Sequence, residues 1–337
     1  MEIKIKMNNT YKEIAEQLKK AQNILILTHV GVDGDGIGSA VSVCKALRMM
    51  GKTAYVLMED EIPDNLSFML GDYVTYDMDI IADDELDVTM CVDCGDETRF
   101  PERVDKFRAG KVKICVDHHG TTEPICDYNY IDPAAAACGE LIFELLKELG
   151  VTPDGKLGTD KEIGEALFAA ITTDTGNFQY SNTTKRTHEI TAELYDWGID
   201  ANKVSVEIYE NMRPQKLIIT NKALDNLEMI AGGKGAVAYV SKEEQEAVGA
   251  KAGETEEVVQ KLRSIAGVEY AAFLKEKDEG VIRVSLRAKR NGDVSVIAKE
   301  FGGGGHTKAA GCTLNMSLEE GVAAIKAAIE REALKNE

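Results

Sequence analysis

The sequence predicts an α/β protein in which a parallel sheet with helices on both faces precedes a second, smaller α/β domain. Three observations support this class. Short apolar runs alternate with segments of helical periodicity in the first half, which is the pattern of strand–helix–strand units. His and Asp residues follow directly after several of these runs. At 337 residues, the chain is also long enough for two separate cores.

The expected elements of the first half follow one another along the chain. Apolar runs with the length of buried strands occupy 24–28, 53–58, 88–92, 112–116 and 128–131. Helical periodicity fills 36–50, 138–149, 161–172 and 184–197. Ligands of parallel α/β sheets collect at the carboxyl ends of the strands. His29, Asp93, Asp117 and Asp174 are expected at such ends.

The second half of the sequence predicts a further α/β unit, which follows a helical, polar stretch that ends at Gly232-Gly233. Its expected elements are strands at 236–240, 270–274 and 281–286, and helices at 254–265, 294–301 and from Leu318 to about Ala333. We therefore expect a catalytic domain over 1–197, a helical connector over 198–232 and a substrate-binding domain over 233–337.

Composition indicates a globular protein of the cytoplasm. Hydrophobic residues make up 44% and charged residues 29%, and no run of about 18 apolar residues predicts a membrane span. The N-terminus lacks the apolar core of a secretory signal. The seven cysteines are an odd number and lie mostly inside apolar runs, as reduced core thiols do.

The charge distribution argues against one kind of partner and favours another. The net charge of −19 argues against a long duplex nucleic acid, which requires many cations on one face. Residues 281–312, however, carry six Lys or Arg against two acids, a local balance of +4. We expect a small anionic ligand to bind there.

The first motif with chemical potential lies in a glycine-rich turn between a predicted strand and a predicted helix. It contains His29, Asp33 and Asp35. The glycines that let this backbone bend sharply are Gly31, Gly34 and Gly36. Asp33 and Asp35 can point to opposite sides of the turn and serve two neighbouring metal ions. The alternative is a turn in which the aspartates only cap the helix.

Asp93 follows the apolar run 88–92 and is a candidate bridging ligand between two metal ions. The surrounding Cys91 and Cys94 form a single Cys-x-x-Cys pair, which would suggest redox or zinc chemistry. Because no second pair exists and Cys91 lies in the apolar run, core thiols are the preferred interpretation. Asp96 is expected to cap the turn that follows.

Asp117, His118 and His119 follow another apolar run, where burial without a partner would be costly. Because neighbours on a strand point to different sides, one histidine is expected to bind metal and the other to face substrate. Asp174 completes the set, with helix capping as its alternative role. Carboxylates and imidazoles without thiolates favour Mn²⁺ or Mg²⁺. Two such ions, roughly 3.5–4 Å apart, would activate a water for attack at phosphorus.

A run of four glycines, 302–305, precedes His306 and lacks the lysine spacing of a P-loop. Exposed amides in such a run can form an anion-binding nest, and Arg287 could hold a phosphate with two parallel hydrogen bonds. A flexible turn is the alternative. The basic segment 281–312 favours binding.

Taken in order, H-x3-DGD-x-IGS (29–39), Asp93, DHH (117–119), TDTG-x-F (173–178) and GGGGH-x2-AAG (302–311) resemble the DHH phosphoesterase superfamily with a DHH-associated C-terminal domain. The resemblance is strongest to the type that hydrolyses very short RNA and 3′-phosphoadenosine 5′-phosphate (pAp), and it covers nearly the whole chain. The family usually has Pro before the first Asp of the DGD turn, where this chain has Val32.

The resemblance implies two Mn²⁺ sites, with Mg²⁺ and Co²⁺ compatible with the same ligands. The first would be held by His29, Asp33 and Asp93, and the second by Asp35, Asp93, His118 and Asp174. His119 and Asp93 would be catalytic, with His119 facing the scissile phosphate. The residues expected to bind substrate are His119, Arg287, Gly304, Gly305 and His306. The active site would lie in the cleft between the domains, and relatives often form homodimers.

The resemblance therefore implies a Mn²⁺-dependent phosphoesterase that converts short oligonucleotides, including the dinucleotide pApA, to 5′-mononucleotides and pAp to AMP. Hydrolysis of the cyclic dinucleotide c-di-AMP is the first alternative, because it uses the same chemistry. A pyrophosphatase and a non-catalytic nucleotide-binding regulator are the others. No membrane partner is expected.

Overall fold

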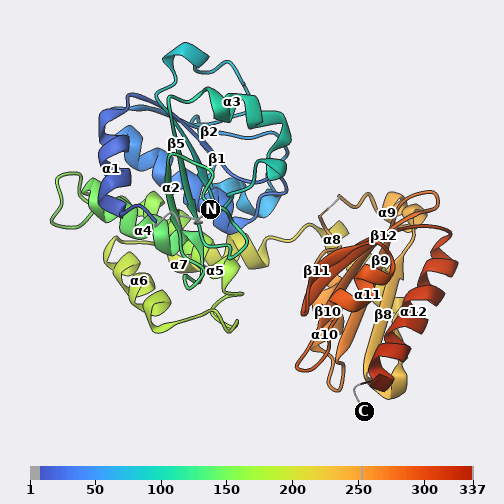
Figure 1. The fold of residues 1–337 in the computed structure, drawn as a ribbon. Helices are drawn as coiled ribbons and strands as arrows, with labels where there is room; N and C mark the ends of the chain where they lie inside the picture. The colour runs from blue at the N-terminus through green and yellow to red at the C-terminus, as the bar shows by residue number, and fades with distance from the viewer. Residues whose placement is uncertain (1–7, 252, 336–337) are drawn as a thin grey trace, which may run out of the picture. The chain divides into compact units, whose positions relative to one another are not determined.

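The computed structural model describes residues 8–251 and 253–335. They form two compact units, one ending at Asn211 and the other beginning at Met212 (Figure 1). This division falls inside the stretch 198–232 that the sequence suggests as a connector. Each unit has its own six-stranded sheet and its own buried apolar clusters. Among the described residues, no helix is both long and apolar enough to span a membrane.

The sheet of the first unit is parallel throughout, as predicted, with the strand order β3-β2-β1-β4-β5-β6. Its strands are β1 (Asn23–Leu27), β2 (Thr53–Leu57), β3 (Val74–Thr75), β4 (Val88–Val92), β5 (Val112–Asp117) and β6 (Tyr128–Ile131). From β1 the chain proceeds outward to one edge, and from β4 to the other. The topological switch point of this sheet therefore lies between β1 and β4, which is where ligands of such sheets bind.

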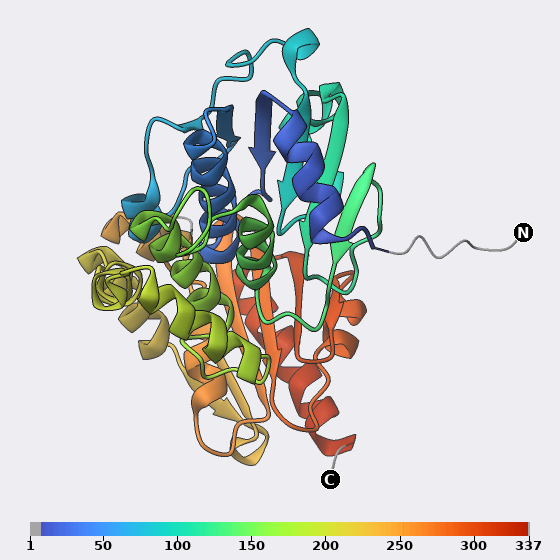
Figure 2. The same ribbon diagram turned by 90° about the vertical axis from the view of Figure 1, so that its left-hand side faces the viewer.

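Helices cover both faces of this sheet, because alternate side chains of each strand point to opposite sides. Ile24 and Ile26 pack in a cluster with α1 (Tyr11–Lys20), α2 (Gly34–Met49) and α4 (Cys138–Leu149). Leu25 and Leu27 pack on the other face against Phe107 of α3 (Val104–Ala109). Figure 2 shows α1 and α2 in front of the strands. The remaining helices are α5 (Lys161–Asp174), α6 (Lys185–Asp196) and α7 (Ala201–Ser205).

Glycines bring the start of α2 close to its neighbours. A Cβ atom at Gly34 would lie 2.4 Å from Thr173 of α5, and one at Gly36 would lie 2.5 Å from the Thr28 hydroxyl. Of the three glycines expected to bend the turn, only Gly31 has a positive φ, at 64°. Gly34 and Gly36 are instead helical, and their role is close packing.

Arg103 ties together the carboxyl ends of β1 and β2. Its guanidinium is fully buried and donates to the Glu59 carboxylate at 2.8 Å, to the Leu57 carbonyl at 2.6 Å and to the Thr28 carbonyl at 2.7 Å. Each of the three guanidinium nitrogens therefore donates to an acceptor near the switch point, which fixes the loops that follow the two strands.

We expect Arg103→Met to lower the free energy of unfolding by about 3–5 kcal/mol, because Glu59 would remain as a buried charge without its partner. Urea denaturation of the metal-free protein measures this loss. Arg48→Met removes the ion-pair partner of the exposed Asp72 and should cost less than about 1 kcal/mol. Equal losses in the two variants would contradict a structural role for Arg103.

The second unit contains a mixed sheet with the strand order β11-β12-β10-β9-β8-β7, in which only β8 and β9 run parallel. The strands are β7 (Glu228–Ile230), β8 (Gly235–Val240), β9 (Tyr270–Asp278), β10 (Val281–Ala288), β11 (Gly304–His306) and β12 (Ala309–Asn315). The helices are α8 (Pro214–Asp225), α9 (Lys242–Val248), α10 (Val258–Ser264), α11 (Ser295–Glu300) and α12 (Leu318–Lys335). The smaller α/β unit is confirmed, although the helix expected from 254 begins only at Val258.

The two faces of this second sheet differ. Leu274, Val284 and Leu286 pack in a cluster with α11 and α12 on one face. On the opposite face, Ala271 and Phe273 of β9 pack in a cluster with α8 and α10. The neighbouring strand β10 carries Arg283, Ser285 and Arg287 toward that same face, where they are partly or fully exposed. This face of β10 and β12 is therefore polar and basic beside an apolar, covered half.

Candidate active site

The loop after β1 brings His29 and Asp33 to the switch point. Asp33 is the N-cap of α2, and its Oδ1 accepts a hydrogen bond from the Gly36 amide at 3.0 Å. The same Oδ1 lies 3.7 Å from Nε2 of His29. Capping, the alternative role suggested by sequence, is thus present together with an imidazole neighbour that capping alone does not require.

Asp35 lies two residues further along, in the first turn of α2, and is fully buried. Its two carboxylate oxygens accept hydrogen bonds from the amides of Cys138, at 2.6 Å, and Gly139, at 2.8 Å, in the first turn of α4. The partial positive charge of a helix N-terminus stabilises a carboxylate in this position. Asp35 and Asp33 therefore point to different sides of the α2 terminus, as predicted from their spacing.

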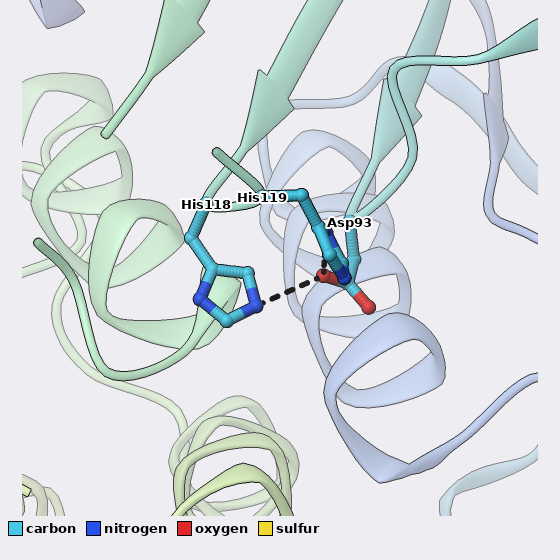
Figure 3. Close-up of side chains that lie close together, drawn as sticks. All are labelled: Asp93, His118 and His119. Carbon is cyan, nitrogen blue, oxygen red and sulfur yellow. Dashed lines mark ion pairs between the residues drawn. The ribbon is translucent and has the colours of Figure 1, made fainter. Parts of the chain in front are cut away.

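Asp93 follows β4 and is the residue that joins the two sides of the site. Its φ of +55° is uncommon for a residue other than glycine, and such strain is found mainly at functional sites. Its Oδ2 lies 3.4 Å from Nε2 of His29. Its Oδ1 lies 3.5 Å from Nε2 of His118, a contact drawn in Figure 3. Oδ1 is buried and has no hydrogen-bond partner among the described residues.

His118 and His119 leave the end of β5 in different directions, and their rings are 66° apart. Nδ1 of His118 donates to the Ala135 carbonyl at 3.2 Å, so its Nε2 is free to bind a ligand. This Nε2 lies 3.6 Å from Asp35 and 3.3 Å from Asp174. Nδ1 of His119 points to Asp117 at 2.7 Å. Two adjacent imidazoles are therefore held by different partners.

Two expectations from the sequence need correction. Asp174 does not follow a strand: it is the last residue of helix α5, which is buried along almost its whole length. Asp117 does end a strand, but its carboxylate turns away from the other ligands and accepts hydrogen bonds from the side chain and the amide of His119 and from the Thr122 hydroxyl. The Asp-x-His spacing of Asp117 and His119 was the one feature of the sequence that could have indicated this hydrogen bond. Asp96 caps the following turn, as predicted.

The electrostatics of the site favour the binding of a cation. Burial, together with the neighbouring carboxylates, raises the pKa of Asp35 well above its usual value and that of Asp174 to about 6. Burial also raises the pKa of Asp93. For His29, burial acts to lower the pKa, but hydrogen bonds to Asp33 and Asp93 outweigh it and raise the pKa to about 10. Without a positive charge, this site holds its protons tightly.

The donor geometry fits divalent metal ions. Within the described ranges, one group of donors consists of His29, Asp33 and Asp93, and another of Asp35, His118 and Asp174. Nitrogen–oxygen separations of 3.3–3.7 Å are long for hydrogen bonds, yet they suit two ligands that each lie about 2.1 Å from one ion. Asp93 directs one oxygen to each group. A third group, Asp93 with both histidines, overlaps the second.

We expect binding of Mn²⁺ to release protons, because His29 with a pKa of about 10 is protonated in the metal-free protein and only neutral imidazole binds metal. Apparent affinity should rise with pH, roughly tenfold per unit for each proton released. Calorimetry at pH 7 in two buffers of different ionisation enthalpy measures the number of protons released per ion bound. His188→Gln, outside the site, should release as many protons as the wild type, whereas buffer-independent heats would contradict a protonated His29.

In the second unit, strand register places two of the predicted substrate-binding residues, Arg287 and His306, on one sheet face. Arg287 of β10 pairs with Ala309 of β12, and Ala309 pairs with His306 of β11. Paired residues point to the same side, so Arg287 and His306 lie in one row with a small side chain between them. Gly305 has a φ of +134°, and a Cβ there would lie 2.6 Å from the Ala309 carbonyl. Glycine is therefore required at this position.

Comparison with known proteins places this architecture in a family. Residues 23–171 match the family model described as DHH family, N-terminal domain, and residues 232–333 match that of the DHHA1 domain. The crystal structure of an exopolyphosphatase-related protein from Bacteroides fragilis has a TM-score of 0.88 at 30% identity and covers 97% of both chains. The chain belongs to the DHH family of phosphoesterases. It is accordingly a hydrolase of phosphoester bonds.

Two further DHH relatives carry a more specific name. The bifunctional oligoribonuclease and PAP phosphatase NrnA of Thermus thermophilus is 28% identical over 95% of this chain and 93% of its own length. The protein of the same name from Bacillus subtilis is 26% identical over 90% of this chain and 92% of its own length. Both matches extend through the two units of this DHH protein.

Proposed function

We propose that this DHH phosphoesterase is a Mn²⁺-dependent enzyme that hydrolyses short oligonucleotides to 5′-mononucleotides and pAp to AMP. The observation that carries the proposal is the position of the Asp93 carboxylate. Its two oxygens face two separate donor groups on either side of the switch point, and one of them is buried and accepts no hydrogen bond from any described residue. The names of the relatives that are similar to this chain over at least nine-tenths of both lengths support the substrates.

Six side chains would hold two divalent ions. His29 and Asp33 would hold one, Asp35, His118 and Asp174 would hold the other, and Asp93 would bridge them. When bound, such a pair of ions supplies a water of lowered pKa and withdraws charge from phosphate oxygens. The protein contributes rigid positioning: carbonyls fix the rings of His29, at 2.9 Å from Val30, and His118, and the first turn of α4 fixes Asp35.

His119 is proposed as the proton donor to the leaving oxygen. Nδ1 is occupied by Asp117, so Nε2 is the ring nitrogen available to a substrate. The imidazole is partly exposed, at 39% of its side-chain surface, as a group that meets substrate must be. The hydrogen bond to Asp117, with a smaller contribution from Asp93, raises the pKa of His119 and keeps the proton on the ring at higher pH.

Substrate binding is proposed for the basic sheet face of the second unit. Arg287 would form two parallel hydrogen bonds with a phosphate, and His306 and the backbone at Gly304 and Gly305 would contact the substrate from the same row and its neighbour. Gly304 is open to solvent and has no neighbour where a side chain would begin. The strongly acidic remainder of the chain favours short substrates over long ones.

The direct test is release of product from pAp, pApA and a five-nucleotide RNA, with Mn²⁺ and with chelator. We expect metal-dependent AMP from pAp and mononucleotides from both oligonucleotides, with relative rates that identify the main substrate. Pyrophosphate and c-di-AMP serve as comparison compounds for the rival activities. Exclusive turnover of either one would replace the proposal, and turnover that persists in chelator would contradict metal dependence.

A further inference from the structure

Arg99 lies beside the proposed metal site, although no sequence motif singled it out. It is the last residue of the short helix Glu97–Arg99, which follows Asp93 closely and is capped by Asp96. The carbonyl of Arg99 accepts a hydrogen bond from the Val30 amide at 2.7 Å, and Val30 is the residue after His29. The backbone of Arg99 is therefore pinned between the two loops that carry His29 and Asp93.

The Arg99 side chain differs from the other arginines of this segment. Arg103 binds the Glu59 carboxylate, and Arg108 binds the Glu97 carboxylate. Arg99 is half-buried, and among the residues that the structure describes none accepts a hydrogen bond from its guanidinium or forms an ion pair with it. A partly desolvated cation that always stays charged favours an anionic partner, and the described protein does not supply one.

The charge of Arg99 reaches both sides of the active site. Burial acts to raise the pKa of Asp33, but His29, the Gly36 amide and, to the smallest extent, Arg99 reverse this and lower it. At His119, whose pKa is raised mainly by Asp117, the charge of Arg99 acts in the opposite direction. Asp33 follows β1 and His119 follows β5, so the guanidinium lies within electrostatic range of groups from both loops.

We propose that Arg99 binds a non-bridging oxygen of the phosphate that is hydrolysed, next to the position served by His119. This inference rests on the proposed function and adds a substrate contact from the first unit. A guanidinium can donate two parallel hydrogen bonds to a phosphate and stabilises the negative charge of its oxygens. Arg99 would thereby select an anionic phosphate group at the scissile position.

A different role for Arg99 would be to neutralise the carboxylates of the metal site. The structure argues against it, because no carboxylate lies within ion-pair distance of the guanidinium among the described residues, whereas the nearby Arg103 and Arg108 each have one. The two roles also predict different measurements. Loss of a neutralising charge would change metal affinity, and loss of a phosphate contact would change the affinity for phosphate while the metal content stays constant.

The test compares Arg99→Gln and Arg99→Lys with the wild type and with Arg48→Gln as a matched control. Arg48 lies at the opposite end of α2 from Asp33, roughly 20 Å away along the helix, and pairs with Asp72. For each Mn²⁺-loaded protein, calorimetry measures the binding of inorganic phosphate, elemental analysis measures metal content, and kcat/KM is measured with pAp and pApA. Thermal unfolding reports whether each variant is folded.

We expect Arg99→Gln to weaken phosphate binding and lower kcat/KM by roughly 10–100-fold, with metal content and Tm unchanged. Arg99→Lys should recover part of the loss, because it keeps the charge without the paired donors. Arg48→Gln should match the wild type. Unchanged phosphate affinity in Arg99→Gln, or loss of metal in that variant, would overturn the inference. If wild-type protein hydrolyses neither nucleotide, the proposed function fails, and phosphate binding alone still decides the role of Arg99.

Discussion

Replacement of Asp93 by asparagine should reduce turnover of pAp by roughly 10³-fold or more and leave the protein with fewer than two bound metal ions. Asparagine keeps the size of the side chain and tolerates the φ of +55° that this position requires. The substitution therefore removes charge and one oxygen with little change of backbone. Kinetics with pAp and metal content after desalting measure the two effects separately.

The folding behaviour of Asp93→Asn provides an independent check. Asp93 is 1% exposed, and burial raises the pKa of its carboxyl in the metal-free site. Removal of this buried charge should leave the Tm in chelator equal to or above that of the wild type. A variant that is inactive and also less stable would indicate a damaged fold rather than a lost ligand.

Asp96→Asn is the matched control for Asp93→Asn. Asp96 is exposed and caps the next turn through a 2.9 Å hydrogen bond from the Thr98 amide, a role that asparagine performs equally well. Its activity and metal content should equal those of the wild type. Substantial Mn²⁺-dependent turnover by Asp93→Asn with two ions bound would contradict the bridging assignment.

The residues that follow strands were the most predictable part of this site. Runs such as Val88–Val92 are continuous, apolar and short, so both the strand and its carboxyl end could be located from sequence. In a parallel sheet, residues after neighbouring strands come together without further information, and this placed His29 and Asp93 at one edge.

Asp174 shows why the rest was harder to predict. The apolar stretch before it, residues 166–171, is buried on all sides within α5, so it lacks the polar positions that reveal helical periodicity. Its identity as a possible ligand could be inferred, and a helix was predicted over 161–172, yet the apolar run 166–171 was also interpreted as ending at the edge of the sheet. A buried helix and a buried strand have the same composition over such a short window.

The prediction for the glycine run before His306 was wrong for a different reason. Glycine has little strand propensity, so residues 302–306 were expected to form a turn or an amide nest. The structure pairs Gly304–His306 with β12 as an antiparallel strand, which positions Gly305 over the Ala309 carbonyl. The pairing depends on a partner strand elsewhere in the chain, and local sequence does not report it.

The second large effect is expected from Asp117, which the structure places beside His119 rather than among the metal donors. Its carboxylate is fully buried and accepts from Nδ1 of His119 at 2.7 Å, from the His119 amide at 3.1 Å and from the Thr122 hydroxyl. We expect Asp117→Asn to lower kcat by roughly 10²–10³-fold, because the neutral amide no longer fixes the charge and tautomer of the imidazole.

The pH profile should separate this role from a merely structural one. Asp117 raises the pKa of His119, so a His119 that donates a proton stays active until pH rises through that raised pKa. Without the carboxylate the pKa falls, and the alkaline limb of kcat should move to lower pH in Asp117→Asn. Thr122→Val removes one hydrogen bond to Asp117 but keeps the Asp117 charge. The alkaline limb of kcat in this variant should therefore stay near that of the wild type.

Metal content completes the argument for Asp117. Because its carboxylate is directed at His119 and Thr122 and belongs to neither donor group, Asp117→Asn should retain both ions while losing turnover. Asp93→Asn should lose both properties together. An Asp117→Asn variant with reduced metal content, or with an unshifted alkaline limb, would show that the DHH aspartate supports the metal donors and does not act through His119.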